Sequence, residues 1–289
     1  MRPSGGGMGI GEVVQRTGVA EATLRMWERR HGFPVPERLL SGHRRYSERE
    51  VELIRAVAAK RAAGLALPVA IEQARSDASE PATSVYAALR RRRPDLETRV
   101  LRKPTMLALS HAIEDEALAR AERLMVFGAF QRQRFYRQAQ LRWRELARTA
   151  EVAIVFGDFD RPRAPRYAPV ELPLPHQHPL NREWAVVCEG QDFAVCLAGW
   201  EPPEERQGPD GLRRFEAIWS VEPEVVREAA RICWAIAEAR RPALAEAEAA
   251  RARLEAPLSA TPESQLRLAT AITARMLAHV SDRLVAAAG

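Results

Sequence analysis

The chain has 289 residues, of which 46% are hydrophobic and 28% charged, a composition typical of a globular protein with room for two domains. No segment approaches the roughly 18 consecutive apolar residues that a membrane-spanning helix needs, and no apolar run follows the opening MRPSGGG, so we expect a cytoplasmic protein without a membrane partner. The formal net charge of +6 favours a polyanionic partner, although a coding bias toward arginine would give the same charge.

The segment from Gly11 to Ser47 carries the strongest signal in the chain. Its hydrophobic spacing predicts a short helix, a tight turn at Gly18 and a second helix over residues 21–31. On a helical wheel, the second helix has two opposite arcs, one with Ala20, Leu24, Trp27 and His31, the other with Ala22, Arg25, Met26 and Arg29. The first arc is expected to pack and the second to face solvent, where guanidinium groups suit the phosphates and guanine edges of duplex DNA.

A basic hairpin is predicted after this helix. Pro34 and Pro36 end the helix, and residues 38–46 can form a hairpin with a tip at Ser41 and Gly42. This geometry would let Arg44 and Arg45 reach a neighbouring run of phosphates, with Tyr46 supporting the hairpin. The segment therefore predicts a winged helix-turn-helix head that binds DNA.

The ordered set of residues in this head resembles the MerR family of transcription regulators, and in detail the branch of light-responsive and curli-type regulators. The set is Thr23-Leu24-Arg25, Trp27-Glu28-Arg29, Pro36, Arg38, Gly42, Arg44 and Tyr46-Ser47. The resemblance implies a homodimer that binds double-stranded promoter DNA, distorts the promoter spacer and acts on RNA polymerase there. It implies DNA contacts by Thr23, Arg25, Met26, Arg29, Arg38, His43, Arg44, Arg45 and Tyr46, although the family usually carries an aromatic residue where Met26 stands.

Two more helices complete the predicted head. Ser47 can cap a helix that runs to about Ala63, with Glu50 three residues after the cap, and a short helix follows over residues 67–75. A polar stretch over residues 76–83 marks a domain boundary. We therefore expect the DNA-binding domain over residues 1–77 and a linker over residues 78–99, whose Arg90–Arg93 charge run is either a solvated face or a contact to flanking DNA.

A different hydrophobic rhythm follows, and it predicts an α/β domain. Residues 105–121 read as a helix, and residues 124–130, 131–149 and 152–156 read as a strand, a helix and a second strand parallel to the first. Residues 170–174 form a further strand, and residues 184–188 and 193–197 form a hairpin. We expect a mixed sheet covered by helices, so that the whole chain has a multidomain α+β fold.

This block resembles the DICT sensory domain through several aromatic and polar motifs. They are Phe127-Gly-Ala-Phe-Gln131, Arg134-Phe-Tyr136, Trp143, Phe156-Gly-Asp158, Glu183-Trp184 and Gly199-Trp-Glu201. The resemblance, placed over residues 100–212, implies a signal-input module whose effector is an unknown small molecule. The candidate ligand-binding residues are Phe127, Phe130, Gln131 and Trp184, and packing around the sheet is the alternative explanation for the aromatic ones.

Residues 213–289 are predicted to be helical and to include a possible dimerisation surface. Apolar residues recur at helical spacing from Val225 to Ala239 and from Leu266 to Leu284. Because apolar spacing does not identify the surface it meets, each stripe either pairs two chains or packs on its own domain. Pro94 and Pro104 argue against a dimerisation helix directly after the head.

The remaining chemistry-bearing residues do not form a recognisable catalytic or metal motif. His176 and His178 lie between prolines and favour a loop over a metal site, and we predict no metal and no cofactor. Cys188 and Cys196 would face opposite sides of the sheet if the hairpin turned on residues 190–191, and the same side with a three-residue turn.

With three cysteines and no nucleophile or phosphate-binding motif, we expect an intracellular non-enzyme and name no catalytic residue. The alternative function is an enzyme or partner-assembly domain fused to an autoregulatory DNA-binding head.

Overall fold

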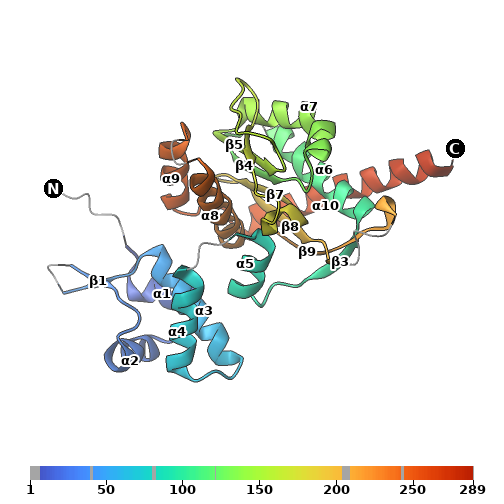
Figure 1. Cartoon of the computed structure of the whole chain (residues 1–289). Helices are drawn as coiled ribbons and strands as arrows, with labels where there is room; N and C mark the ends of the chain where they lie inside the picture. The colour runs from blue at the N-terminus through green and yellow to red at the C-terminus, as the bar shows by residue number, and fades with distance from the viewer. Residues whose placement is uncertain are drawn as a thin grey trace. The chain divides into compact units, whose positions relative to one another are not determined.

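The computed structural model describes residues 7–39, 42–79, 83–120, 122–203, 209–241 and 244–288, and it divides the chain into two compact units. The first unit spans Met1–Pro81 and the second Ala82–Gly289. We call them the head and, after the resemblance of its sequence, the sensory unit, and describe each by itself (Figure 1). Within the described ranges, no helix is both long and apolar enough to cross a membrane.

The head has the element order that the sequence predicts. It contains α1 (Ile10–Thr17), α2 (Glu21–His31), β1 (Glu37–Arg38), β2 (Arg44–Arg45), α3 (Glu48–Ala62) and α4 (Leu67–Ser79). Gly18 ends α1 with φ of 69°, a backbone conformation that glycine adopts without steric cost, and the turn leads directly into α2. The Ser47 hydroxyl accepts the backbone N–H of Glu50 and caps α3, as predicted.

One small hydrophobic core holds the head together. Leu24 and Trp27 of α2 are buried against Val13 of α1 and against Val51 and Ile54 of α3. This burial fixes one side of α2 against the other helices, so the opposite side faces outward. His31, which the wheel placed on the packed side, is exposed because α2 ends there and Gly32 turns the chain away.

The segment predicted as a linker, residues 78–99, contains a folded helix, and this corrects the sequence-based domain boundary. The helix α5 (Val85–Arg92) buries Val85, Tyr86, Ala88 and Leu89 in the core of the sensory unit. The Ser84 hydroxyl caps α5, and the buried Glu183 carboxylate accepts the N–H groups of Val85 (3.0 Å) and Tyr86 (3.1 Å). The arginine run Arg90–Arg93 is typical of a solvated segment. The apolar residues before it, however, have helical spacing.

The sensory unit is built on a seven-stranded mixed sheet with the order β3-β9-β8-β7-β4-β5-β6. The strands β4, β5 and β6 are parallel, and the other neighbouring pairs are antiparallel. The predicted strand-helix-strand unit is present, because α7 joins the parallel strands β4 and β5. The bounds are β3 (Arg99–Arg102), β4 (Met125–Ala129), β5 (Val152–Gly157), β6 (Val170–Pro173), β7 (Glu183–Glu189), β8 (Ala194–Trp200) and β9 (Arg214–Ser220).

Helices cover both faces of this sheet (Figure 1). On one face lie α5, α8 (Pro223–Arg240) and α9 (Ala247–Glu255), and on the other α6 (Lys103–Arg120), α7 (Gln133–Thr149) and α10 (Pro262–Ala288). A glycine is required where α7 crosses β4, because a Cβ on Gly128 would collide with the ring of Trp143. The prediction of a mixed sheet covered by helices is confirmed.

The two C-terminal apolar stripes have different surroundings. The stripe on α8 is buried against the sheet through Val225, Ala229 and Ile232. On α10, only Leu268 and Ile272 are fully buried among the residues whose side chains the structure describes, and Leu266 and Leu277 are exposed at 69% and 58%. The side chain of Leu284 lies outside the described residues.

Candidate nucleic-acid interface and sensory site

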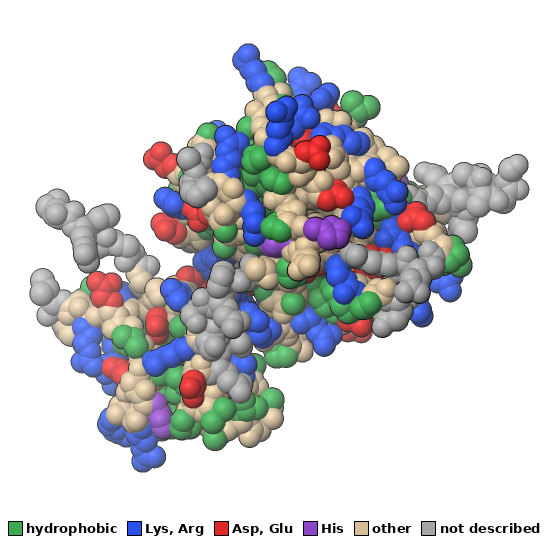
Figure 2. All heavy atoms as spheres, in the orientation of Figure 1, with side chains coloured by type: hydrophobic (Ala, Val, Ile, Leu, Met, Phe, Trp, Pro, Cys, Tyr) green, Lys and Arg blue, Asp and Glu red, His purple; other side chains and the backbone are tan. Residues whose placement is uncertain are grey.

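The outward side of α2 presents two exposed arginines. Arg25 forms an ion pair with Glu21 one turn earlier, with its Nε 2.8 Å from the carboxylate, and its side chain remains 56% exposed. Arg29 lies one turn later and is also exposed. An exposed pair of this kind is weak, so Arg25 can exchange the Glu21 carboxylate for a phosphate or a base edge. Figure 2 shows Lys and Arg side chains on the part of the head where Figure 1 labels α2.

The hairpin β1–β2 stands beside α2 as a wing, and Glu28 of α2 holds it there. The carboxylate of Glu28 accepts the Arg44 Nε at 2.7 Å and an Arg38 guanidinium nitrogen at 2.8 Å. A second Arg44 nitrogen lies 3.2 Å away, which makes that contact bidentate. Glu28 therefore fixes the position of both wing arginines relative to the reading side of α2.

The contacts of Glu28 with Arg38 and Arg44, which we call the clamp, lead to a pH-dependent prediction. The hydrogen bond from Arg44 keeps the pKa of Glu28 below its ordinary value of 4.5, so the clamp stabilises the head above that pH and is lost as the pH falls through the lowered pKa. We expect Glu28→Gln to lower the free energy of unfolding by about 1 kcal/mol at pH 7, and the difference from wild type to vanish in strong acid.

Urea unfolding of both proteins across the pH range measures this difference. Glu37→Gln, at an exposed position of β1, is the matched control and should behave like wild type. A difference between Glu28→Gln and wild type that persists unchanged below pH 3 would show that the clamp is not the cause.

The other predicted DNA contacts lie in three environments. His43 and Arg45 are exposed on the wing, and Arg45 donates to the Gly7 carbonyl at 3.3 Å. Thr23 is half-buried, and Met26 is half-buried against the core of the head. Tyr46 is 1% exposed and pairs with Met8 through two backbone hydrogen bonds, so it supports the wing from inside, as the sequence predicts, and does not offer its ring as a DNA contact. Ser41 of the predicted tip lies outside the described residues, and Gly42 has φ of 81°.

The structure does not bring the four predicted ligand-binding residues together in one pocket. Phe127 is buried on the sheet face that carries α5 and α8, whereas Phe130 and Trp184 pack on the opposite face. Phe130 contacts the rings of Tyr136 and Trp143 edge to face. Because side chains alternate between the faces of a strand, Phe127 and Phe130 could not line the same cavity unless the chain left the sheet between them.

Gln131 lies instead in a polar network where β4 ends. Its side-chain amide donates to Glu201 at 2.7 Å and accepts from Arg213 at 3.0 Å, and Arg213 also binds Glu201 at 2.7 Å. This network stands at the carboxyl ends of the parallel strands, the edge at which open α/β sheets usually bind ligands. Gln131 is therefore the one predicted ligand-binding residue with a polar environment suited to recognition.

Sequence reasoning missed a buried acid on α6. Glu114 is 3% exposed, accepts the Trp143 Nε1–H at 3.1 Å, and has one carboxylate oxygen without a hydrogen bond. Burial raises the pKa of Glu114 to about 8, and the nearby Arg142 opposes this only in part. It was missed because Glu114 stands in a run of three acids, residues 114–116, which reads as a solvent-facing segment.

The raised pKa of Glu114 predicts that the sensory unit loses stability as the pH rises. In the unfolded chain the carboxyl ionises near pH 4.5, whereas in the folded chain it keeps its proton to about pH 8, so stability falls between these values by up to about 1.4 kcal/mol per pH unit. Glu114→Gln should remove that slope and melt at a higher temperature than wild type at pH 7.5. Thermal unfolding from pH 5 to pH 8 tests this, and parallel curves for the two proteins would contradict it.

The candidate metal and redox residues have structural surroundings. The His178 ring accepts the Leu180 backbone N–H, and within the described ranges no group of three or more His, Cys, Asp or Glu side chains is arranged to hold a metal ion. The hairpin turns one residue later than expected, with Cys188 opposite Val195 and Cys196 opposite Val187. The two thiols therefore face opposite sides of the sheet and cannot form a disulfide.

Two protein families match this chain, and the gap between their matches includes Pro81, where the first structural unit ends. The family described as "MerR HTH family regulatory protein" matches residues 8–76, and the family described as "Sensory domain in DIguanylate Cyclases and Two-component system", or DICT, matches residues 83–202. The second match includes α5 and so begins earlier than the predicted residue 100. The HTH-type transcriptional repressor CarA of Myxococcus xanthus is 44% identical over 70 residues, which is 24% of this chain and 24% of CarA.

Proposed function

Because the chain joins a MerR-type helix-turn-helix domain to a DICT sensory domain, we propose that it regulates transcription by binding promoter DNA under the control of a signal received by the sensory unit. The observation that carries this proposal is the exposed Arg25 and Arg29 pair on α2, beside a wing that Glu28 holds in place. A helix of this kind fits the major groove, and the wing arginines reach the adjacent phosphates. CarA is a transcriptional repressor, which supports a role in regulation, although the similarity to it covers about a quarter of either chain.

The chain is proposed to act as a homodimer on a two-fold related operator. In this arrangement two heads occupy half-sites, distort the spacer between promoter elements and alter its use by RNA polymerase. The energy of that distortion depends on which conformation of the regulator is populated, so a signal that shifts the population shifts transcription. Both the dimer and the distortion are inferences from the resemblance of the head.

The outer side of α10 is the surface that we assign to dimerisation. Leu266 and Leu277 are exposed there, and their spacing of eleven residues corresponds to three helical turns, so they lie on one side of α10. We expect a dimer in sedimentation equilibrium, and a monomer when both leucines are replaced by glutamate. A stable dimer of that double variant would exclude α10 as the interface.

The effector is proposed to be a small molecule that binds at the carboxyl edge of the parallel strands, near Gln131. The polar network of Gln131, Glu201 and Arg213 offers hydrogen-bond donors and acceptors that could be exchanged for those of a ligand. A metabolite fraction that raises the melting temperature of wild type, and of Gln131→Ala much less, would support this assignment by mass action.

Selection from a random-sequence duplex library tests the proposed function. The full chain is expected to enrich one motif with two related half-sites, whose centres are separated by a whole number of helical turns. The same selection with Arg30→Ala, an exposed arginine on another side of α2, should return the same motif. Recovery of a random pool by the wild-type chain would refute sequence-specific DNA binding.

A further inference from the structure

The connection between β5 and β6 is a stiff, exposed, basic loop. Residues 160–167 are exposed, and prolines stand at positions 162, 165 and 169. The backbone of Arg163 pairs with that of Glu171 through hydrogen bonds of 3.0 and 2.8 Å, and the Ala168 N–H donates to the Pro165 carbonyl at 3.3 Å. These contacts fix the backbone of the loop and leave Arg161, Arg163 and Arg166 in solvent.

Tyr167 at the end of this loop is held outward in an unusual conformation. In the described part of the chain it is the one non-glycine residue with positive φ, at 57°, and its side chain is 63% exposed. The Arg166 guanidinium lies 4.7 Å from the centre of its ring. A left-handed backbone costs a bulky residue free energy, and no burial of the tyrosine compensates for that cost.

The arginines of this surface are not neutralised by neighbouring acids. Arg137 on α7 pairs with Glu171 at 2.7 Å, whereas Arg144, Arg161, Arg163 and Arg166 have no ion-pair partner among the described residues. Asp160 is the one acid within the exposed stretch 160–167. We call Arg144, Arg161, Arg163, Arg166 and Tyr167 the arginine surface.

The loop and α7 both carry arginines close to Tyr136. Burial raises the pKa of the Tyr136 hydroxyl to about 12, and the charges of Arg137, Arg144 and Arg163 oppose this shift. Arg163 comes from the loop and the other two from α7, so both elements bring positive charge near the same hydroxyl. Figure 2 shows Lys and Arg side chains gathered at the top of the view, over α7 and the β5–β6 connection.

We propose that the arginine surface contacts the phosphate backbone of duplex DNA outside the sequence read by the head. Guanidinium and tyrosine hydroxyl groups are the donors that proteins use for phosphates, and unpaired cations gain free energy by displacing counterions. A protein partner is less well matched, because a protein interface needs an apolar core. On this side of α7 the one large apolar side chain that is exposed is Leu141, and a single leucine does not make such a core. The inference rests on the proposed function and adds a second DNA contact to it.

The test compares two duplexes that carry the selected motif, one minimal and one with about 20 additional base pairs on each side. We expect the longer duplex to bind wild type on the order of tenfold more tightly at low salt, with a salt dependence steeper by about 0.9 for each added phosphate contact. Arg161→Gln/Arg163→Gln/Arg166→Gln should lose this gain and keep its affinity for the minimal duplex. All three side chains are exposed, so the circular dichroism spectrum should not change.

A control with the same change in charge is R123Q/R251Q/R267Q, whose arginines are 76%, 64% and 70% exposed and lie outside α7 and the β5–β6 connection. The control should keep the gain from the longer duplex. Three results would overturn the inference and leave the proposed function intact. The loop variant could keep the tighter binding of the longer duplex, or the control could lose it equally. In the third, the loop binds an acidic peptide and wild type binds the longer duplex no more tightly than the minimal one. Failure of wild type to prefer the motif on either duplex would overturn both.

Discussion

Alanine at both Arg25 and Arg29 is expected to remove sequence-specific DNA binding by the full chain while leaving its fold unchanged. Each arginine that contacts a guanine edge contributes about 1–3 kcal/mol of discrimination, so the double variant should bind the selected motif on the order of a hundredfold more weakly. Both side chains are exposed, and neither takes part in the core of the head. Fluorescence anisotropy on the selected motif and on a scrambled duplex measures the loss.

The matched control for this experiment is Arg30→Ala on the same helix. Arg30 is exposed and is turned by about 100° from Arg29, so its removal changes the charge without removing a base contact. We expect a small, uniform loss of affinity for both duplexes. If Arg25→Ala/Arg29→Ala discriminated the motif from the scrambled duplex as well as wild type does, α2 would not be the reading helix.

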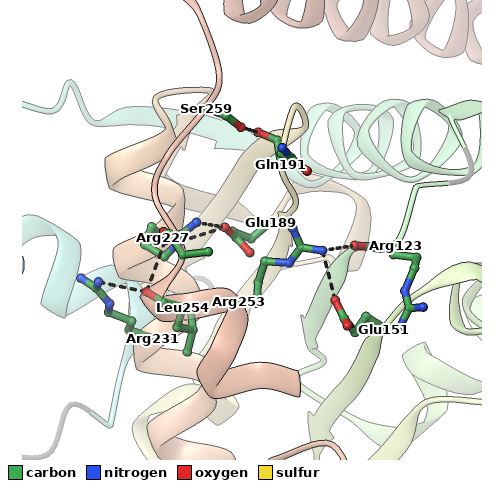
Figure 3. Close-up of polar contacts among 10 residues, drawn as sticks. Arg123, Glu151, Glu189, Gln191, Arg227, Arg231, Arg253, Leu254 and Ser259 are labelled. Carbon is green, nitrogen blue, oxygen red and sulfur yellow. Dashed lines mark hydrogen bonds and ion pairs between the residues drawn. The ribbon is translucent and has the colours of Figure 1, made fainter. Parts of the chain in front are cut away.

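The second large effect is expected from Arg227→Met, which should lower the free energy of unfolding by about 3–5 kcal/mol. Arg227 on α8 is 5% exposed, and its Nε donates to the buried Glu189 carboxylate at 2.8 Å (Figure 3). It also donates to the carbonyls of Leu254 and Ala256 at the end of α9, at 3.2 and 2.7 Å. Removing the guanidinium therefore leaves a buried carboxylate without its counter-charge and frees the end of α9.

Replacing both partners distinguishes the loss of a charge pair from a simple loss of packing. Arg227→Met/Glu189→Met removes the unpaired charge, and we expect it to regain most of the stability that Arg227→Met loses. Arg253→Met is the control in the same region, because Arg253 contacts Glu151 and the Arg123 carbonyl, each at 3.1 Å, and is 20% exposed (Figure 3). It should cost about 1 kcal/mol. A double variant no more stable in urea unfolding than Arg227→Met would contradict the charge-pair explanation.

Hydrophobic periodicity was sufficient to predict most of the elements. The helix α2 and its packed residues Leu24 and Trp27 follow from the wheel, and the parallel pair β4–β5 follows from two apolar runs around an amphipathic helix. These predictions succeed because a residue that repeats at helical or strand period meets one surface along the whole element. The exposure of Arg25 and Arg29 follows from the same rule.

The sequence could not reveal interactions that depend on distant parts of the chain. Glu28 was counted in the head motif without a role, because its partners Arg38 and Arg44 come from the wing. The helix α5 was assigned to a linker because the acid that holds its first turn, Glu183, lies on β7 about a hundred residues later. Phe127 and Phe130 were grouped as one site because neighbours in sequence hide the fact that a sheet separates them.

The central claim is that the exposed side of α2 reads DNA in the major groove. Methylation interference of the full chain on its selected motif tests this most directly, because dimethyl sulfate places a methyl group on guanine N7, the atom that an arginine fork would contact. We predict that N7 methylation blocks binding at guanines in both half-sites. Binding that is unaffected by N7 methylation at every guanine of the motif would contradict the account.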